Sequence, residues 1–145
     1  MSARKCAKES YFWQKHLRPW LDAHGFVNNR LAFNGIGETD CFAYRYPWFF
    51  GIELKRISTD NAETAFRQMD AALTAAQRLR RKRVVASGGL HVVMAPGHNG
   101  WLYATVTQKT YTMGVIVNSY AIHGNTMADA IHCFFKKYEA VGWNL

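Results

Sequence analysis

The sequence predicts one mixed α/β (α+β) domain over residues 1–145, in which helices cover a central mixed β-sheet. Two observations lead to this fold class. Amphipathic helical patterns occur near both ends and in the middle of the chain, and strand-like runs fill the intervals between them. No internal repeat, low-complexity tract or linker divides the 145 residues, a length that suits a single hydrophobic core.

The first predicted element is a helix over residues 7–24. Apolar residues at helical spacing run from Trp13 to Leu21, and Gly25 ends the pattern. Pro19 lies inside this segment and removes one backbone hydrogen bond. We therefore expect a kink, or a break into two short helices, just before Pro19.

Three strand-like runs follow, over residues 26–33, 39–46 and 48–55. The first two are joined by the turn Gly35-Ile36-Gly37, and Pro47 separates the second from the third. This arrangement predicts an antiparallel meander.

A long helix is predicted next, from Asp60 to about Arg80. Asp60-x-x-Glu63 has the form of a capping box, and an Ala-rich amphipathic stretch follows it. The remaining pattern predicts strands over residues 90–95, 101–107 and 113–120 and a last helix over 126–140.

The composition excludes some classes of protein. With 49% hydrophobic residues the chain can build a core, so disorder is excluded as its main state. No apolar run approaches the roughly 20 residues of a spanning helix, and residues 1–5 do not lead into a signal-peptide core, so we expect a soluble cytoplasmic protein without a membrane partner. Cys6, Cys41 and Cys133 are widely spaced, which favours buried reduced thiols over disulfides or a zinc site.

The charge is concentrated in one half of the chain. The net charge is +8, and the first 85 residues hold 15 of the 18 Lys and Arg against 8 of the 10 Asp and Glu. An acidic partner is expected to meet this half. Nucleic acid is the commonest partner of this kind, with an acidic protein or an anionic membrane surface as alternatives.

The most informative residues are Asp40, Glu53 and Lys55. Asp40 begins one predicted strand and Glu53 ends its hairpin partner, so the two carboxylates can converge at one edge of the sheet. Glu53 and Lys55 are two apart on a strand and share a face. Two carboxylates with the backbone carbonyl of Leu54 suit a hard divalent cation such as Mg²⁺, which could activate a water while Lys55 assists.

These residues resemble a known superfamily, the PD-(D/E)XK nucleases, and in particular its Holliday-junction-resolvase-like and VRR-NUC-like small members. The resemblance covers roughly residues 7–75. Its pattern consists of Glu9, His24-Gly25-Phe26, Gly37-x-x-Asp40, Gly51-Ile52-Glu53-Leu54-Lys55 and Gln68. Thr39 stands where the family usually has the proline before the aspartate.

The resemblance implies a restriction-endonuclease-like core and a Mg²⁺- or Mn²⁺-dependent DNA endonuclease. Asp40 and Glu53 would be metal ligands and Lys55 the catalytic lysine, with Glu9 reaching the metal through water and Gln68 positioning the substrate. Small members commonly act as homodimers on branched DNA, and the virus-type branch suggests a phage or viral protein.

A basic run is expected to contact the DNA backbone. It places five cations in six positions: Arg78, Arg80, Arg81, Lys82 and Arg83. The alternative is a solvated helix end, where cations oppose the helix dipole, but five cations exceed what capping needs.

Alternatives also remain for the candidate site. Asp40 could cap a turn, and Glu53 with Lys55 could be an exposed strand pair. At the level of function, the alternative is a non-cleaving nucleic-acid-binding or anti-defence module on the same fold.

Overall fold

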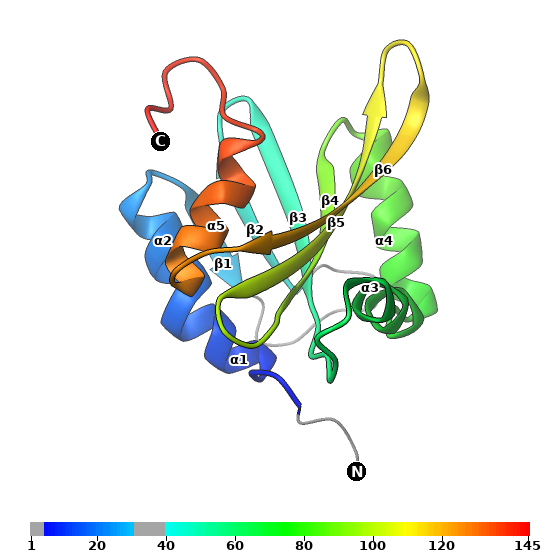
Figure 1. Ribbon diagram of the computed structural model, residues 1–145. Coiled ribbons are helices and arrows are strands. Elements are labelled where there is room, and N and C mark those ends of the chain that lie inside the picture. Colours follow the sequence, from blue (N-terminus) through cyan, green and yellow to red (C-terminus); the bar gives the residue numbers. More distant parts are fainter. Residues whose placement is uncertain (1–4, 31–39) are drawn as a thin grey trace.

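Helices cover both faces of a six-stranded mixed sheet (Figure 1), as the computed structural model of residues 5–30 and 40–145 shows. The mixed α+β class and the mixed sheet flanked by helices are therefore confirmed. The elements are α1 (Glu9–Phe12), η1 (Trp13–Leu17, a π-helical turn), α2 (Arg18–Ala23), β1 (Val27–Arg30), β2 (Cys41–Arg45), β3 (Trp48–Leu54), α3 (Ala62–Ala71), α4 (Ala75–Ala86), β4 (Leu90–Pro96), β5 (Trp101–Thr110), β6 (Gly114–His123) and α5 (Met127–Lys136).

The strands lie in the sheet in their chain order, from β1 to β6. Neighbouring strands are antiparallel except β3 and β4, which are parallel. A parallel pair needs a long crossover, and α3 with α4 supplies it. Cys41 pairs with Ile52 in the β2–β3 hairpin, so Asp40 lies beside Glu53 at the open end of that hairpin.

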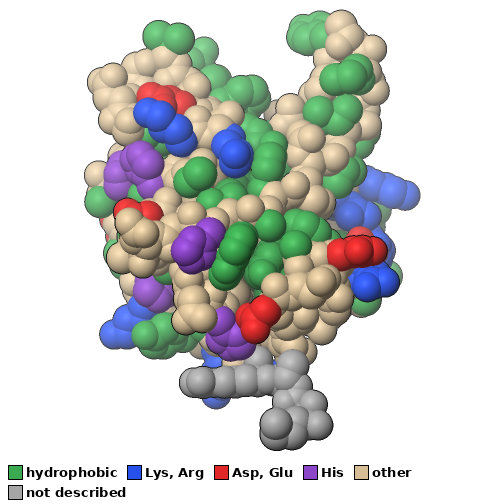
Figure 2. All heavy atoms as spheres, viewed as in Figure 1, with side chains coloured by type: hydrophobic (Ala, Val, Ile, Leu, Met, Phe, Trp, Pro, Cys, Tyr) green, Lys and Arg blue, Asp and Glu red, His purple; other side chains and the backbone are tan. Residues whose placement is uncertain are grey.

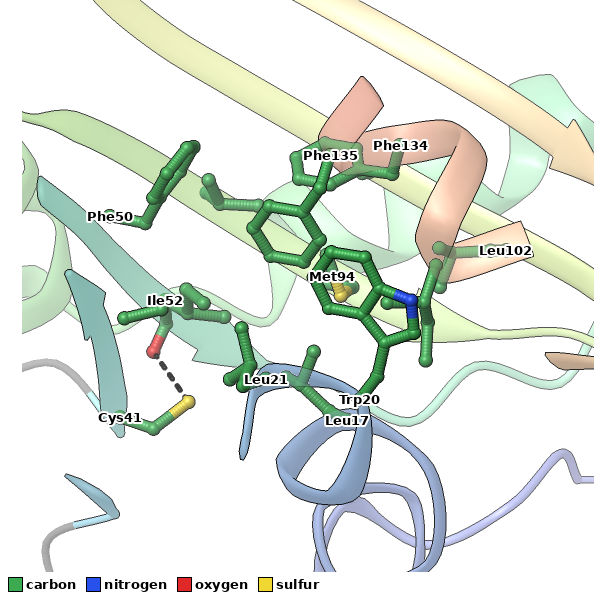
Figure 3. Close-up of a cluster of buried hydrophobic side chains, with 14 of the residues drawn as sticks. Leu17, Trp20, Leu21, Cys41, Phe50, Ile52, Met94, Leu102, Phe134 and Phe135 are labelled. Atoms are coloured by element: carbon green, nitrogen blue, oxygen red, sulfur yellow. Dashed lines mark hydrogen bonds between the residues drawn. The ribbon is translucent and has the colours of Figure 1, made fainter. Parts of the chain in front are cut away.

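The larger core lies between the sheet and the helices α1, η1, α2 and α5. Trp20 stacks on Phe135 with ring centroids 4.8 Å apart, and both pack with Leu17 and Leu21 (Figure 3). Ile52 on β3 points into the same core, whereas its neighbour Glu53 points to the opposite face.

The opposite face of the sheet is covered by α3 and α4. Met69 and Leu73 pack there on Val93, Ala95 and Tyr103. This second cluster is smaller than the first, and it borders the buried polar residues of the candidate site.

The helical segment near the N-terminus keeps its continuity through Pro19. The π-helical turn η1 precedes α2, and Pro19 lies in the first turn of α2. Because proline has no backbone N–H to donate to the preceding turn, the expected irregularity takes the form of this widened turn.

The prediction of one long helix from Asp60 to about Arg80 was wrong. The segment forms α3 and α4, separated by residues 72–74, and α3 is capped by Asn61 rather than Asp60. The hydroxyl of Thr74 accepts from the Gln77 N–H while the Gln77 side chain accepts from the Thr74 N–H. This reciprocal capping box starts a new helix within the Ala-rich stretch.

The hairpin of β5 and β6 projects beyond the body of the protein, at the upper right in Figures 1 and 2. Its exposed apolar side chains are Tyr111, Met113, Val115 and Val117. The last helix ends at Lys136, earlier than expected, and Trp143 returns to the core, where its Nε1–H donates to the carbonyl of Tyr46 at 2.7 Å.

None of the three cysteines is in a disulfide. Cys6 and Cys41 are buried, but the expectation was wrong for Cys133, because its position on α5 faces solvent.

Across the described residues, α-helices are too short or too polar to span a bilayer.

Candidate functional site

Asp40 and Glu53 meet at the end of the β2–β3 hairpin, on the face covered by α3 and α4. The backbone N–H of Asp40 donates to Glu53 Oε2 at 3.3 Å, and the N–H of Leu54 donates to Asp40 Oδ2 at 2.9 Å. Asp40 is 7% exposed and Glu53 is fully buried. Two acidic side chains therefore share one buried corner of the sheet.

Lys55 follows directly on β3 and lies on the same side as Glu53. Its Nζ donates to the carbonyl of Ala72 at 3.1 Å and to Gln77 Oε1 at 2.9 Å, both at the junction of α3 and α4. The structure thus brings together Asp40, Glu53 and Lys55. It also anchors the lysine to the crossover.

Gln77 connects these groups, and the sequence analysis did not identify it. Its Nε2 donates to Glu53 Oε2 at 3.2 Å, while its Oε1 accepts from Lys55 Nζ and from the Thr74 N–H. The signal that could have found it is the pattern Thr74-x-x-Gln77, which places a glutamine in the first turn of a helix that follows the Glu-x-Lys strand.

The electrostatics of the site are dominated by burial. Loss of solvent, as the larger cause, and the charge of the neighbouring Asp40 carboxylate together raise the pKa of Glu53 to about 8. The backbone N–H of Asp40 and the charge of Lys55 oppose this rise without cancelling it. At neutral pH the Glu53 carboxyl therefore holds a proton unless a positive charge arrives to replace it.

His91 lies next to Glu53 on the neighbouring strand β4. Its Nε2 is 3.8 Å from Glu53 Oε1, and both side chains are fully buried. Burial, with the charge of Arg81 as a second cause, lowers the pKa of His91 to about 4. The ring is therefore neutral at pH 7, and the contact is not an ion pair.

Glu9 lies at the start of α1 and is half-buried. Burial and the Asp40 carboxylate raise its pKa, whereas Lys55 and Arg30 lower it. These influences locate Glu9 near the acidic corner. Glu9 and Arg30 also line a shallow surface pocket with Lys8, Ser10 and Arg56.

Gln68 lies elsewhere. Its Oε1 accepts from the Ser58 N–H at 3.0 Å and its Nε2 donates to the Ser58 hydroxyl at 3.4 Å. Both polar atoms of its amide therefore hold the loop after β3, and Gln77 is the glutamine that contacts Glu53 and Lys55.

The basic run belongs to α4, and all of it except Arg83 lies before the last turn, because α4 continues to Ala86. Arg78 and Arg81 each reach Asp70 on α3, at 3.4 and 3.9 Å. Lys82 and Arg83 are exposed. Blue side chains gather at this edge of the molecule in Figure 2.

Of the side chains at this site, the carboxyl groups of Asp40 and Glu53 are the ones that suit a hard cation. The described residues contain no group of three or more His, Cys, Asp and Glu side chains placed to hold a metal ion. Glu53 Oε1, however, is buried and has no hydrogen-bond partner in the described part of the chain. Two adjacent carboxylates with one unsatisfied oxygen fit a cation that keeps several waters, as Mg²⁺ does.

No protein-family model matches the sequence, and a comparison with curated proteins finds no match either.

Proposed function

We propose that this protein is a metal-dependent DNA endonuclease with a restriction-endonuclease-like core. The observation that supports the proposal is the buried pair of Asp40 and Glu53 with the Lys55 ammonium on the same side. Two adjacent buried acids destabilise a fold unless a positive charge compensates them. A bound cation would supply that charge and would release the proton from Glu53.

Each residue of the site has a distinct part in the proposed reaction. Asp40 and Glu53 would hold Mg²⁺ or Mn²⁺, with the Leu54 carbonyl as a further ligand, and the bound ion would polarise the phosphodiester and lower the pKa of a water. The Leu54 N–H keeps Asp40 oriented. Lys55 stabilises charge on the phosphoryl oxygens, and Gln77 holds Lys55 and Glu53 in register.

Substrate binding is assigned to α4. Its cations meet the phosphate backbone, and this contact does not depend on sequence. The resemblance adds two proposals, a preference for branched DNA and a homodimer. A cytoplasmic location is a further proposal that does not rest on the resemblance.

The experiment that tests the proposal is a cleavage assay on single-stranded, duplex, flap and four-way-junction DNA with Mg²⁺, Mn²⁺ or EDTA. Glu53→Gln and Lys55→Ala are compared with the matched exposed controls Glu63→Gln and Lys15→Ala. Loss of one electrostatic group from such a site costs about 10²–10³ in rate, so both site variants should be strongly impaired and both controls active.

Two outcomes would contradict the proposal. Full cleavage by either site variant would refute the assigned mechanism. No metal-dependent cleavage on any substrate, with DNA binding retained, would favour the non-cleaving nucleic-acid-binding module instead.

A further inference from the structure

Glu53 and His91 are buried polar neighbours, and the atoms that face each other, Glu53 Oε1 and His91 Nε2, lack hydrogen bonds among the described residues. Both side chains have 0% exposure, and Glu53 Oε1 and both ring nitrogens of His91 have no hydrogen-bond partner among residues 5–30 and 40–145. Buried polar atoms are nearly always hydrogen-bonded, so three unsatisfied atoms at one place call for an explanation.

The sheet register explains why the histidine can reach the carboxylate. His91 pairs with Gly51 across the parallel strands, and Glu53 is two residues further along β3 on the same face. Gly51 has no side chain that could lie between the imidazole and Glu53. The rest of β4 is apolar and buried, which makes a histidine there unusual.

The remaining distance is small. Nε2 and Oε1 are 3.8 Å apart, whereas an N–H···O hydrogen bond has a length of about 2.9 Å. A modest rotation of the two side chains closes this gap. A neutral ring with its proton on Nε2 would then donate to the carboxylate.

We propose that His91 is a positioning residue for Glu53, donating from Nε2–H to Oε1 when a cation is held by Asp40 and Glu53. A carboxylate offers about four lone-pair directions. The Asp40 N–H and Gln77 Nε2 already occupy two on Oε2. With His91 on Oε1, one direction is left for the cation beside Asp40.

This inference rests on the proposed function, and its test measures metal affinity instead of cleavage. Titration calorimetry with Mn²⁺ compares the wild type with His91→Leu, which lacks a donor, and with His91→Gln, whose Nε2 can replace the ring nitrogen. Hydrogen-bonded supports of metal ligands are worth about 10–100-fold in affinity, so His91→Leu should bind Mn²⁺ that much more weakly. His91→Gln should restore binding to within a few-fold.

If His91 were purely structural, His91→Leu would lower the melting temperature in EDTA without changing the affinity for Mn²⁺. Equal Mn²⁺ affinity in the wild type and His91→Leu would therefore overturn the proposal. Nitrogen NMR of the metal-free wild type above about pH 9, where Glu53 is a carboxylate without a cation, is a second arm that needs no variant to fold. An Nε2–H tautomer of His91 supports the proposal, whereas an Nδ1–H tautomer overturns it. If the wild type binds no Mn²⁺, the proposed function fails and the tautomer alone decides the role of His91.

Discussion

Replacing Gln77 with alanine tests how the helical crossover holds the acidic corner. The substitution removes three hydrogen bonds: from Lys55 Nζ at 2.9 Å, to Glu53 Oε2 at 3.2 Å and from the Thr74 N–H at 3.0 Å. The bond from the Gln77 N–H to the Thr74 hydroxyl remains, so half of the capping box survives.

The expected loss of stability follows from these contacts. A net hydrogen bond contributes about 1 kcal/mol, and one to a charged group roughly 1.5–3 kcal/mol. Alanine returns a few tenths of a kcal/mol through its helix propensity. The free energy of unfolding should therefore fall by about 3–5 kcal/mol, and the melting temperature by roughly 6–20 °C.

Urea unfolding in EDTA measures the change, with two comparison variants. Gln77→Glu keeps the acceptor for Thr74 and Lys55 but places a carboxylate against Glu53, so it separates capping from support of the acid. Gln68→Ala removes the contacts to Ser58 and leaves the site intact. If the proposed function is right, Gln77→Ala also lowers cleavage and Gln68→Ala does not.

The reasoning would be refuted if Gln77→Ala were as stable as the wild type. It would also be refuted if Gln68→Ala and Gln77→Ala impaired cleavage equally, because then the contacts of Gln77 with Glu53 and Lys55 would carry no particular weight.

Three further predictions concern pH, salt and the core. Because the folded-state pKa of Glu53 is raised to about 8, the stability that its protonated form contributes is lost as pH rises from about 4.5 to about 8; Glu53→Gln in EDTA should gain on the wild type over this range, and parallel urea-unfolding profiles would contradict this. Alanine at Arg80, Arg81 and Arg83 together should lower the salt slope of DNA binding by roughly one unit per lost phosphate contact, in a filter-binding titration; an unchanged slope returns the run to a helix-end role. Trp20→Ala should cost about 3–5 kcal/mol in urea unfolding, and a loss below 1 kcal/mol would mean that its stack on Phe135 matters little.

The part of the site that lies on one hairpin could be predicted from the sequence. Strand alternation places Glu53 and Lys55 on one face, and hairpin pairing brings Asp40 beside Glu53. Both relations are local, and they depend only on a period of two and on a short connection.

The other residues depend on non-local pairing that periodicity does not reveal. Gln77 reaches Glu53 only because the Ala-rich stretch divides at Thr74, and a continuous helical pattern hid that cap. His91 reaches Glu53 only through the parallel register with Gly51, which joins residues 40 positions apart in the chain. Gln68 was a candidate through the family resemblance alone, and its contacts with Ser58 could not be predicted from its position in the sequence.

The parallel pairing of β3 with β4 also has a consequence for folding order. The β2–β3 hairpin can form by itself, but its pairing with β4 requires closure of the chain segment that contains α3 and α4, and contacts of this separation form slowly. The hydrogen bonds from Gln77 Nε2 to Glu53 and from Lys55 Nζ to the Ala72 carbonyl can form only after that closure. Partial opening of the crossover would therefore hydrate Glu53 before the Trp20 core is disturbed. Amide exchange should show α4 opening more readily than β2 and β3.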